Sequence, residues 1–134
     1  MYHDSEEEAL AADPRLGQAI ALFNAGDWYG CHDSLEELWH ETSGNMRPLL
    51  QGILQIAVAE LHHERGNCRG ATILMGEGLG RLKGVLAARA LGLDLGNLRL
   101  TVAERLRALQ EQRPLQELPK PWLSADSLPP CSVD

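Results

Sequence analysis

Residues 24–39 read Asn-Ala-Gly-Asp-Trp-Tyr-Gly-Cys-His-Asp-Ser-Leu-Glu-Glu-Leu-Trp and predict a helix whose apolar face carries two ionisable side chains. On a helical wheel, His32 and Glu36 fall within about 80° of Trp28, on the same side as Trp39. Surface helices normally point such groups at water. Because burial of unpaired charges is costly, we expect a partner across the fold, a metal or a ligand to satisfy them.

The length and charge of the chain limit its class. A chain of 134 residues is most simply one domain, long enough to bury a core without disulfides or a structural metal. The formal net charge of −7 would repel phosphate backbones, and no basic stripe offsets it. We therefore expect no nucleic-acid partner.

Cysteine usage and hydropathy bear on location. Cys31, Cys68 and Cys131 are odd in number and lack the spacing of a disulfide framework or a thiolate zinc site. No uninterrupted apolar run reaches the ~18 residues of a membrane span, and the beginning of the chain does not resemble a signal peptide. We expect a soluble cytoplasmic protein without a membrane partner.

Turn and capping residues predict the fold class, an all-α single bundle of about five helices. Asp13 followed by Pro14 predicts a helix start, and Gly26 its end, with Asp27 capping the next helix. Asn45 is the expected cap of the third helix. The predicted helices span residues 14–25, 27–42, 46–64, 68–90 and 97–112, the last opening at Asn97 or at the capping box Thr101-x-x-Glu104. Nothing before Asp13 shows a strong period.

Prolines predict an extended tail after the last helix. We therefore divide the chain into a helical bundle domain, residues 1–113, and an extended Pro-rich C-terminal tail, residues 114–134. Leu118, Trp122 and Leu123 are the expected anchors of this tail on the bundle.

One polar seam interrupts the third predicted helix, which is otherwise apolar almost all the way round. Gln51, Gln55 and His62 fall within about 40° of one another and form the natural partner of the second helix. We interpret this as a buried hydrogen-bonded network that fixes the register of the two helices and accepts the indole N–H of Trp39. Its members are His32, Glu36, Trp39, Gln51, Gln55 and His62.

Two other readings of the second helix remain open. His32, Glu36 and His40 at i, i+4 and i+8 share one stripe, and their ligand types suit zinc, iron or manganese. Alternatively, His32 serves as acid or base with Glu36 orienting it. Apart from a possible divalent metal, we predict no cofactor. A small polar ligand is also possible. Catalytic residues beyond this pair are unknown.

Two Glu-x-x-His pairs, Glu37–His40 and Glu60–His63, are similar to the motif of di-iron bundles. Glu37 falls near 180° from the apolar centre of its helix, however, and should be solvated. The two further glutamates that such a centre needs are also hard to find. The position of Glu37 and the missing glutamates therefore argue against a di-iron site.

A stripe of glycines marks the fourth predicted helix. Gly76, Gly80 and Gly84 lie at i, i+4 and i+8, and each costs about 1 kcal/mol relative to alanine. We expect close contact with another helix to compensate for this loss.

Two blocks of residues recur at fixed helical offsets in this chain. They are Phe23, Gly26, Tyr29, His32, Leu35, Glu36 and Trp39 in a first block, and Leu49, Leu50, Gln51 and Gly52 in a second. With these blocks, the chain resembles the domain of unknown function 309 family over residues 20–86. Asp33 stands where the family usually has glutamate, and either His62 or His63 matches the family's histidine. The resemblance implies an all-helical fold and supplies no established activity.

Together these patterns predict a small cytoplasmic binding or interaction module of uncharacterised function. The alternative is an enzyme that uses His32 and Glu36 for metal-dependent hydrolysis or acid–base chemistry. The apolar third helix and the tail with Trp122 carry more hydrophobic surface than five short helices easily cover. We therefore also expect a homo-oligomer, which would bury the excess.

Overall fold

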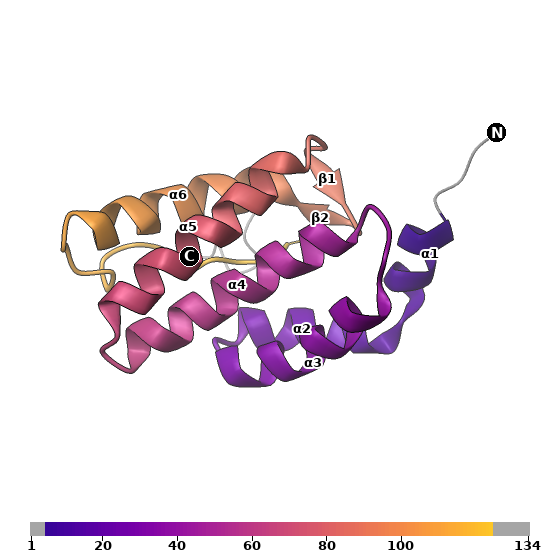
Figure 1. Cartoon of the computed structure of the whole chain (residues 1–134), viewed down its shortest axis with the longest axis horizontal. Coiled ribbons are helices and arrows are strands. Elements are labelled where there is room, and N and C mark those ends of the chain that lie inside the picture. The colour runs from indigo at the N-terminus through magenta and orange to yellow at the C-terminus, as the bar shows by residue number, and fades with distance from the viewer. Residues whose placement is uncertain (1–4, 125–134) are drawn as a thin grey trace, which may run out of the picture.

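Helices dominate the computed structural model, which describes residues 5–124 (Figure 1). The all-α fold class is confirmed, with one small hairpin added. The tail residues 125–134, including Cys131, Pro129 and Pro130, lie outside the described part of the chain. The elements are α1 (Ser5–Ala12), α2 (Pro14–Asn24), α3 (Trp28–Glu41), α4 (Arg47–Glu64), α5 (Cys68–Gly84), β1 (Arg89–Ala90), β2 (Leu93–Asp94) and α6 (Leu95–Gln110).

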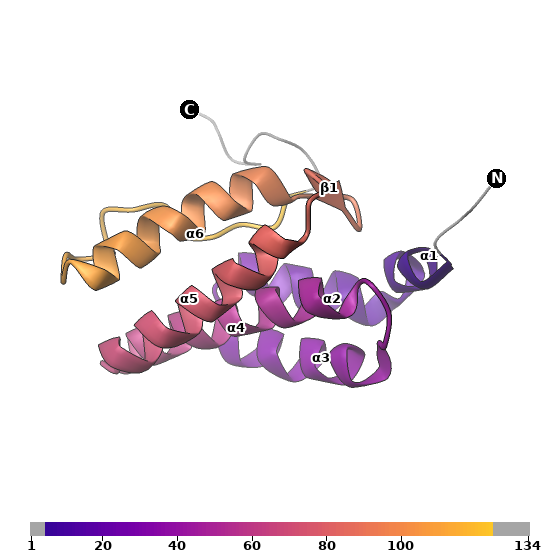
Figure 2. The same ribbon diagram turned by 45° about the horizontal axis from the view of Figure 1, so that its top comes forward.

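From α2 onward, each helix packs against the next along the chain, and the contact between α4 and α5 is the most extensive. Figure 2 shows α6 on one side of the α4–α5 pair and the α2–α3 pair on the other. Buried apolar side chains from all of these helices form one core. No helix within residues 5–124 has the length and apolar character needed to cross a membrane.

The α2–α3 and α4–α5 turns are built in the same way. Gly26 and Gly66 end the first helix of each pair with positive φ values of 77° and 80°. Asp27 and Asn67 then accept a hydrogen bond from the amide three residues later, each at 2.9 Å. Short turns of this kind make the two helices that they join pack antiparallel. The cap predicted at Asp27 is confirmed.

Helix α1 lies in the acidic segment for which no helix was predicted. Its apolar period is weak, and its carboxylates attach it to the bundle instead. Glu7 Oε2 accepts the backbone N–H of Leu91 at 2.8 Å, and Glu6 Oε2 accepts that of Gly44 at 2.8 Å. A helix held by such remote hydrogen bonds leaves no periodic signal in the sequence.

The start of α4 also differs from the prediction. Asn45 does not cap it, because Met46 is the N-cap residue and makes no side-chain cap. Glu6 of α1 accepts the Met46 N–H at 3.1 Å in its place. A remote carboxylate therefore takes a role that we assigned to a local side chain.

Helix α5 ends at Gly84 and not at Ala90, because the following backbone is held by α6. The Arg99 guanidinium donates to the carbonyls of Leu82, Val85 and Ala87 at 2.9–3.1 Å. These bonds satisfy carbonyl groups that would otherwise continue the helix.

A tight hairpin joins α5 to α6. Its strands pair in antiparallel register through a two-residue turn, Leu91–Gly92, in which both φ values are positive. Asp94 accepts from the Asn97 N–H at 3.0 Å and caps α6. The helix therefore opens before both expected starts, Asn97 and Thr101.

Helices α4 and α5 approach each other closely at Gly52 and Gly78. A Cβ on Gly78 would lie 2.9 Å from the Gly52 carbonyl oxygen, and one on Gly52 would lie 3.2 Å from that of Gly78. The predicted stripe of Gly76, Gly80 and Gly84 is wrong, because a Cβ at each would meet nothing within 4 Å. On α5, the stripe is centred about 160° from Gly78, so it lies on the face opposite the contact with α4.

Candidate functional site

The structure corrects the predicted burial of His32 and Glu36, whose side chains are 30% and 45% exposed. The buried residues of α3 are centred about 40° from Trp28, on the side away from His32. Glu36 therefore lies at the edge of the solvated face, some 120° from the centre of the buried stripe. The buried residues are Trp28, Cys31, Leu35 and Leu38.

The surface stripe of α3 is a loose set of ion pairs. His32 Nε2 lies 3.7 Å from Glu36 Oε1, and His40 Nε2 lies 4.0 Å from Glu36 Oε2. These distances are too long for the hydrogen bond by which Glu36 would orient a catalytic histidine. Within residues 5–124, no three His, Cys, Asp or Glu side chains are grouped so that they could hold a metal ion.

The half-buried polar residues of α4 do not form the predicted network with α3. Gln55 donates to Glu77 of α5 at 3.1 Å, and His62 contacts Asn67 at 3.1 Å in the following turn. In the described part of the chain, no hydrogen bond joins Gln51, Gln55 or His62 to His32 or Glu36.

Trp39 also lacks the expected polar acceptor. Its indole Nε1 is buried without a hydrogen-bond partner among the described residues. The ring instead carries the Arg47 guanidinium, whose central carbon lies 4.2 Å from the ring centroid. Trp39 therefore contributes packing and a cation–π contact at the α3–α4 junction.

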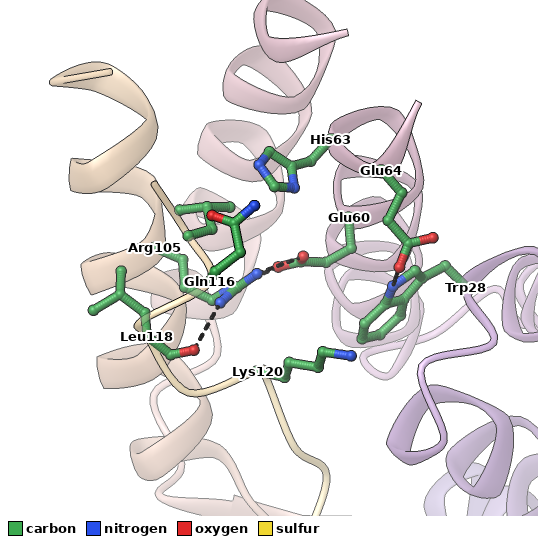
Figure 3. A pocket seen from close by; sticks show the side chains of 9 residues that line it. Trp28, Glu60, His63, Glu64, Arg105, Gln116, Leu118 and Lys120 are labelled. Atoms are coloured by element: carbon green, nitrogen blue, oxygen red, sulfur yellow. Dashed lines mark hydrogen bonds and ion pairs between the residues drawn. The ribbon is translucent and has the colours of Figure 1, made fainter. Parts of the chain in front are cut away.

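A pocket of about 300 Å³ lies elsewhere, where the ends of α3 and α4 meet α6 and the tail (Figure 3). Such a volume is at the lower end of the range for small-molecule sites. The tail returns along α6 to close one side, and Asn24 fixes it by exchanging two hydrogen bonds with the Leu123 backbone, 2.8 and 2.9 Å long. The pocket is lined by Trp28, Glu60, His63, Glu64, Arg105, Leu115, Gln116, Leu118 and Lys120.

A buried ion pair forms the floor of this pocket. Glu60 and Arg105, 3% and 4% exposed, are joined by Nε–Oε2 and Nη2–Oε1 contacts of 2.6 and 2.7 Å. The third nitrogen of Arg105 donates to the carbonyl oxygens of Pro119 at 3.0 Å and Leu118 at 3.4 Å. The guanidinium thus links α4, α6 and the tail.

Trp28 forms an apolar wall of the pocket. It is buried, its ring packs edge-on against Phe23 with centroids 5.1 Å apart, and its Nε1 donates to Glu64 Oε2 at 3.0 Å. Behind this wall, burial raises the pKa of the Cys31 thiol to about 12, and the negative charge of Asp27 adds to the effect. Cys31 is therefore a packing residue and not a nucleophile.

Three polar side chains of the pocket are candidates to contact a ligand. The Lys120 ammonium, the His63 ring and the Gln116 amide have no hydrogen-bond or ion-pair partner within residues 5–124. Figure 3 shows Lys120 beside the Trp28 ring and His63 across the pocket from it. The site therefore offers a cation, an amide and an imidazole around an apolar wall.

Sequence reasoning missed Arg105, although a signal was present. Leu98, Val102, Arg105 and Leu109 follow one another at i, i+4, i+7 and i+11, so the arginine stands on the apolar stripe of its helix. The same criterion that singled out His32 applies more strongly here. Glu60 and His63 were noted only as a Glu-x-x-His pair.

Comparison with known proteins supports the family resemblance. A family model described as Domain of unknown function (DUF309) matches residues 16–74. Uncharacterized protein YpuF of Bacillus subtilis (strain 168) is 38% identical over 88 residues, which cover 64% of this chain and 48% of that protein. The chain thus spans about half the length of this curated relative. The family match includes Trp28, Glu60 and His63 but ends before Arg105 and the tail.

Proposed function

We propose, from the match of residues 16–74 to a family of unknown function and from the pocket beside it, that the protein is a small-molecule binding module. Its ligand is a small organic anion held against Trp28. Concave sites with an apolar wall and a few polar groups are typical of such binding.

Lys120 is the lining residue that supports an anionic ligand. All three guanidinium nitrogens of Arg105 donate to Glu60 or to the tail, so we assign this residue to the floor of the pocket and not to ligand binding. The Glu60 charge is neutralised in the same pair. Among residues 5–124, Lys120 is then the unpartnered cation of this pocket, and an ammonium binds carboxylate or phosphate oxygens well. The Glu64 carboxylate also lines the pocket, but it accepts from the Trp28 indole and makes no ion pair with Lys120.

The observation that carries the proposal is the position of Lys120. It follows Pro119, whose carbonyl is held by Arg105, so the backbone that places the ammonium is fixed even though the side chain is exposed. A ligand that binds here meets a largely pre-formed site.

Isothermal titration calorimetry with butanoate and with inorganic phosphate tests the proposal. The chain has two lysines, so Lys83→Gln on α5 is a matched control for Lys120→Gln. We expect parent and Lys83→Gln to bind at least one anion equally, and Lys120→Gln to bind it at least about tenfold more weakly, the loss of one charged contact. Equal binding by both variants, or none by the parent, contradicts the proposal.

We also propose that the protein is a cytoplasmic homo-oligomer. Its odd, scattered cysteines support the location. Leu86 and Leu100 support self-association, because they are 93% and 73% exposed and belong to segments that Arg99 ties together. Light scattering should give an oligomer for the parent and a monomer for the Leu86→Ser/Leu100→Ser double variant. A monomeric parent contradicts self-association.

A further inference from the structure

We propose that the ligand is an elongated monocarboxylate whose head binds Lys120 and whose apolar body extends into a second cavity. This inference rests on the proposed function and adds the shape and class of the ligand. It is carried by two cavities that share a boundary.

The second cavity has a volume of about 510 Å³ and lies where the α4–α5 turn meets the end of α6. His63 and Gln116 line both cavities, so the two adjoin at these side chains. Neither side chain is held by a hydrogen bond within residues 5–124, so no such bond in this part of the chain fixes the boundary between the two cavities.

The lining of the second cavity favours an apolar group. Leu109 and Pro114 supply hydrocarbon surface, and the Cys68 thiol is a weakly polar neighbour. Arg113 also borders the cavity, but its Nε donates to Glu111 at 2.8 Å, so this charge is already paired. A second acidic group on the ligand would compete there with Glu111 for the Arg113 guanidinium, which favours a monocarboxylate over a dicarboxylate.

A chain-length series tests the proposal by calorimetry on the full chain. Butanoate, hexanoate and octanoate share one head group and differ in the length of the body. We expect the affinity to rise about fourfold per added methylene, the increment of burying one such group. Lys120→Gln should weaken every member by the same factor.

A substitution within the second cavity provides a further check. Pro114→Asp places a charge at this exposed position and should abolish the gain with chain length. Pro48→Asp is the matched control, since Pro48 is also exposed but lies in the first turn of α4, at the opposite end of that helix from His63. This control should retain the parent series.

Cys68 reports independently on the same cavity. In a Cys131→Ser background, octanoate should slow the reaction of Cys68 with a thiol reagent at least threefold, whereas butanoate should not. Lys120-dependent binding with a flat chain-length series and unprotected Cys68 overturns this inference and leaves the proposed function standing. If no carboxylate or phosphate binds, the proposed function fails as well.

Discussion

Arg105 and Glu60 lie 45 positions apart and form a buried, two-pronged ion pair between α6 and α4, with contacts of 2.6 and 2.7 Å. The same guanidinium holds the Pro119 carbonyl at 3.0 Å. One side chain therefore fixes two helices and the tail segment that carries Lys120. The stability of the bundle and the shape of the pocket depend on the same contact.

Glu60→Gln should lower the free energy of unfolding by about 3 kcal/mol, because it leaves the Arg105 charge buried without a counterion. Urea denaturation measures this change. Glu104→Gln, an exposed position on α6, is the control and should stay within about 0.5 kcal/mol of the parent. A Glu60→Gln variant as stable as the control would show that the pair contributes nothing.

Gly78→Ala should destabilise the protein by about 1–3 kcal/mol, since its Cβ would lie 2.9 Å from the Gly52 carbonyl oxygen. Gly80→Ala on the same helix meets open space and should stabilise by about 0.5–1 kcal/mol through helix propensity. Thermal unfolding of the two variants should thus shift in opposite directions. Shifts of the same sign would refute the assigned contact.

Cys31 and Cys68 should differ sharply in reactivity. Burial raises the Cys31 pKa to about 12, so almost no thiolate is present at pH 8, whereas Cys68 is exposed. In a Cys131→Ser background, a chromogenic thiol reagent should label one cysteine rapidly and the second only after denaturant is added. Two fast thiols in the native protein would contradict the burial of Cys31.

Acid should remove a stabilising contribution centred on Arg15. Its hydrogen bonds lower the pKa values of Asp13 and Glu41 in the folded protein. Because these folded pKa values are depressed, the contribution is present above the unfolded values and is lost as pH falls through the folded ones. The stability difference between parent and Arg15→Gln should therefore be largest near neutral pH and shrink below about pH 4. Arg69→Gln, at an exposed arginine, should show a difference that does not depend on pH.

Local signals in the sequence predicted much of the fold. Asp13 with Pro14 and Gly26 with Asp27 set helix ends through contacts between near neighbours. Contacts of this kind can be predicted from a short stretch of sequence. Helix α1 and the start of α4 escaped prediction because Glu6 acts on backbone 38 and 40 positions away. The end of α5 was also not predicted, because Arg99 of α6 binds the Val85 carbonyl that follows it.

The candidate site was harder to predict than the fold. A helical wheel centred on Trp28 placed His32 too near the core. The buried residues Cys31 and Leu38 shift the centre of the buried face to the side of Trp28 away from His32. The pocket also needs Arg105 and Lys120 to meet α4, and no local pattern encodes such distant pairings. The arginine on the apolar stripe of α6 was the available clue.

We propose that Lys120 receives the anionic group of the ligand, and a nuclear magnetic resonance titration observes this ammonium group itself. Methylation of the two lysines with ¹³C-labelled formaldehyde gives one dimethyl-lysine signal for each, and Lys120→Gln assigns them. On titration with octanoate, we predict that the Lys120 signal moves along a saturable curve while the Lys83 signal stays in place. Signals that move in parallel with total ion concentration, or a Lys120 signal that does not move, would contradict the claim.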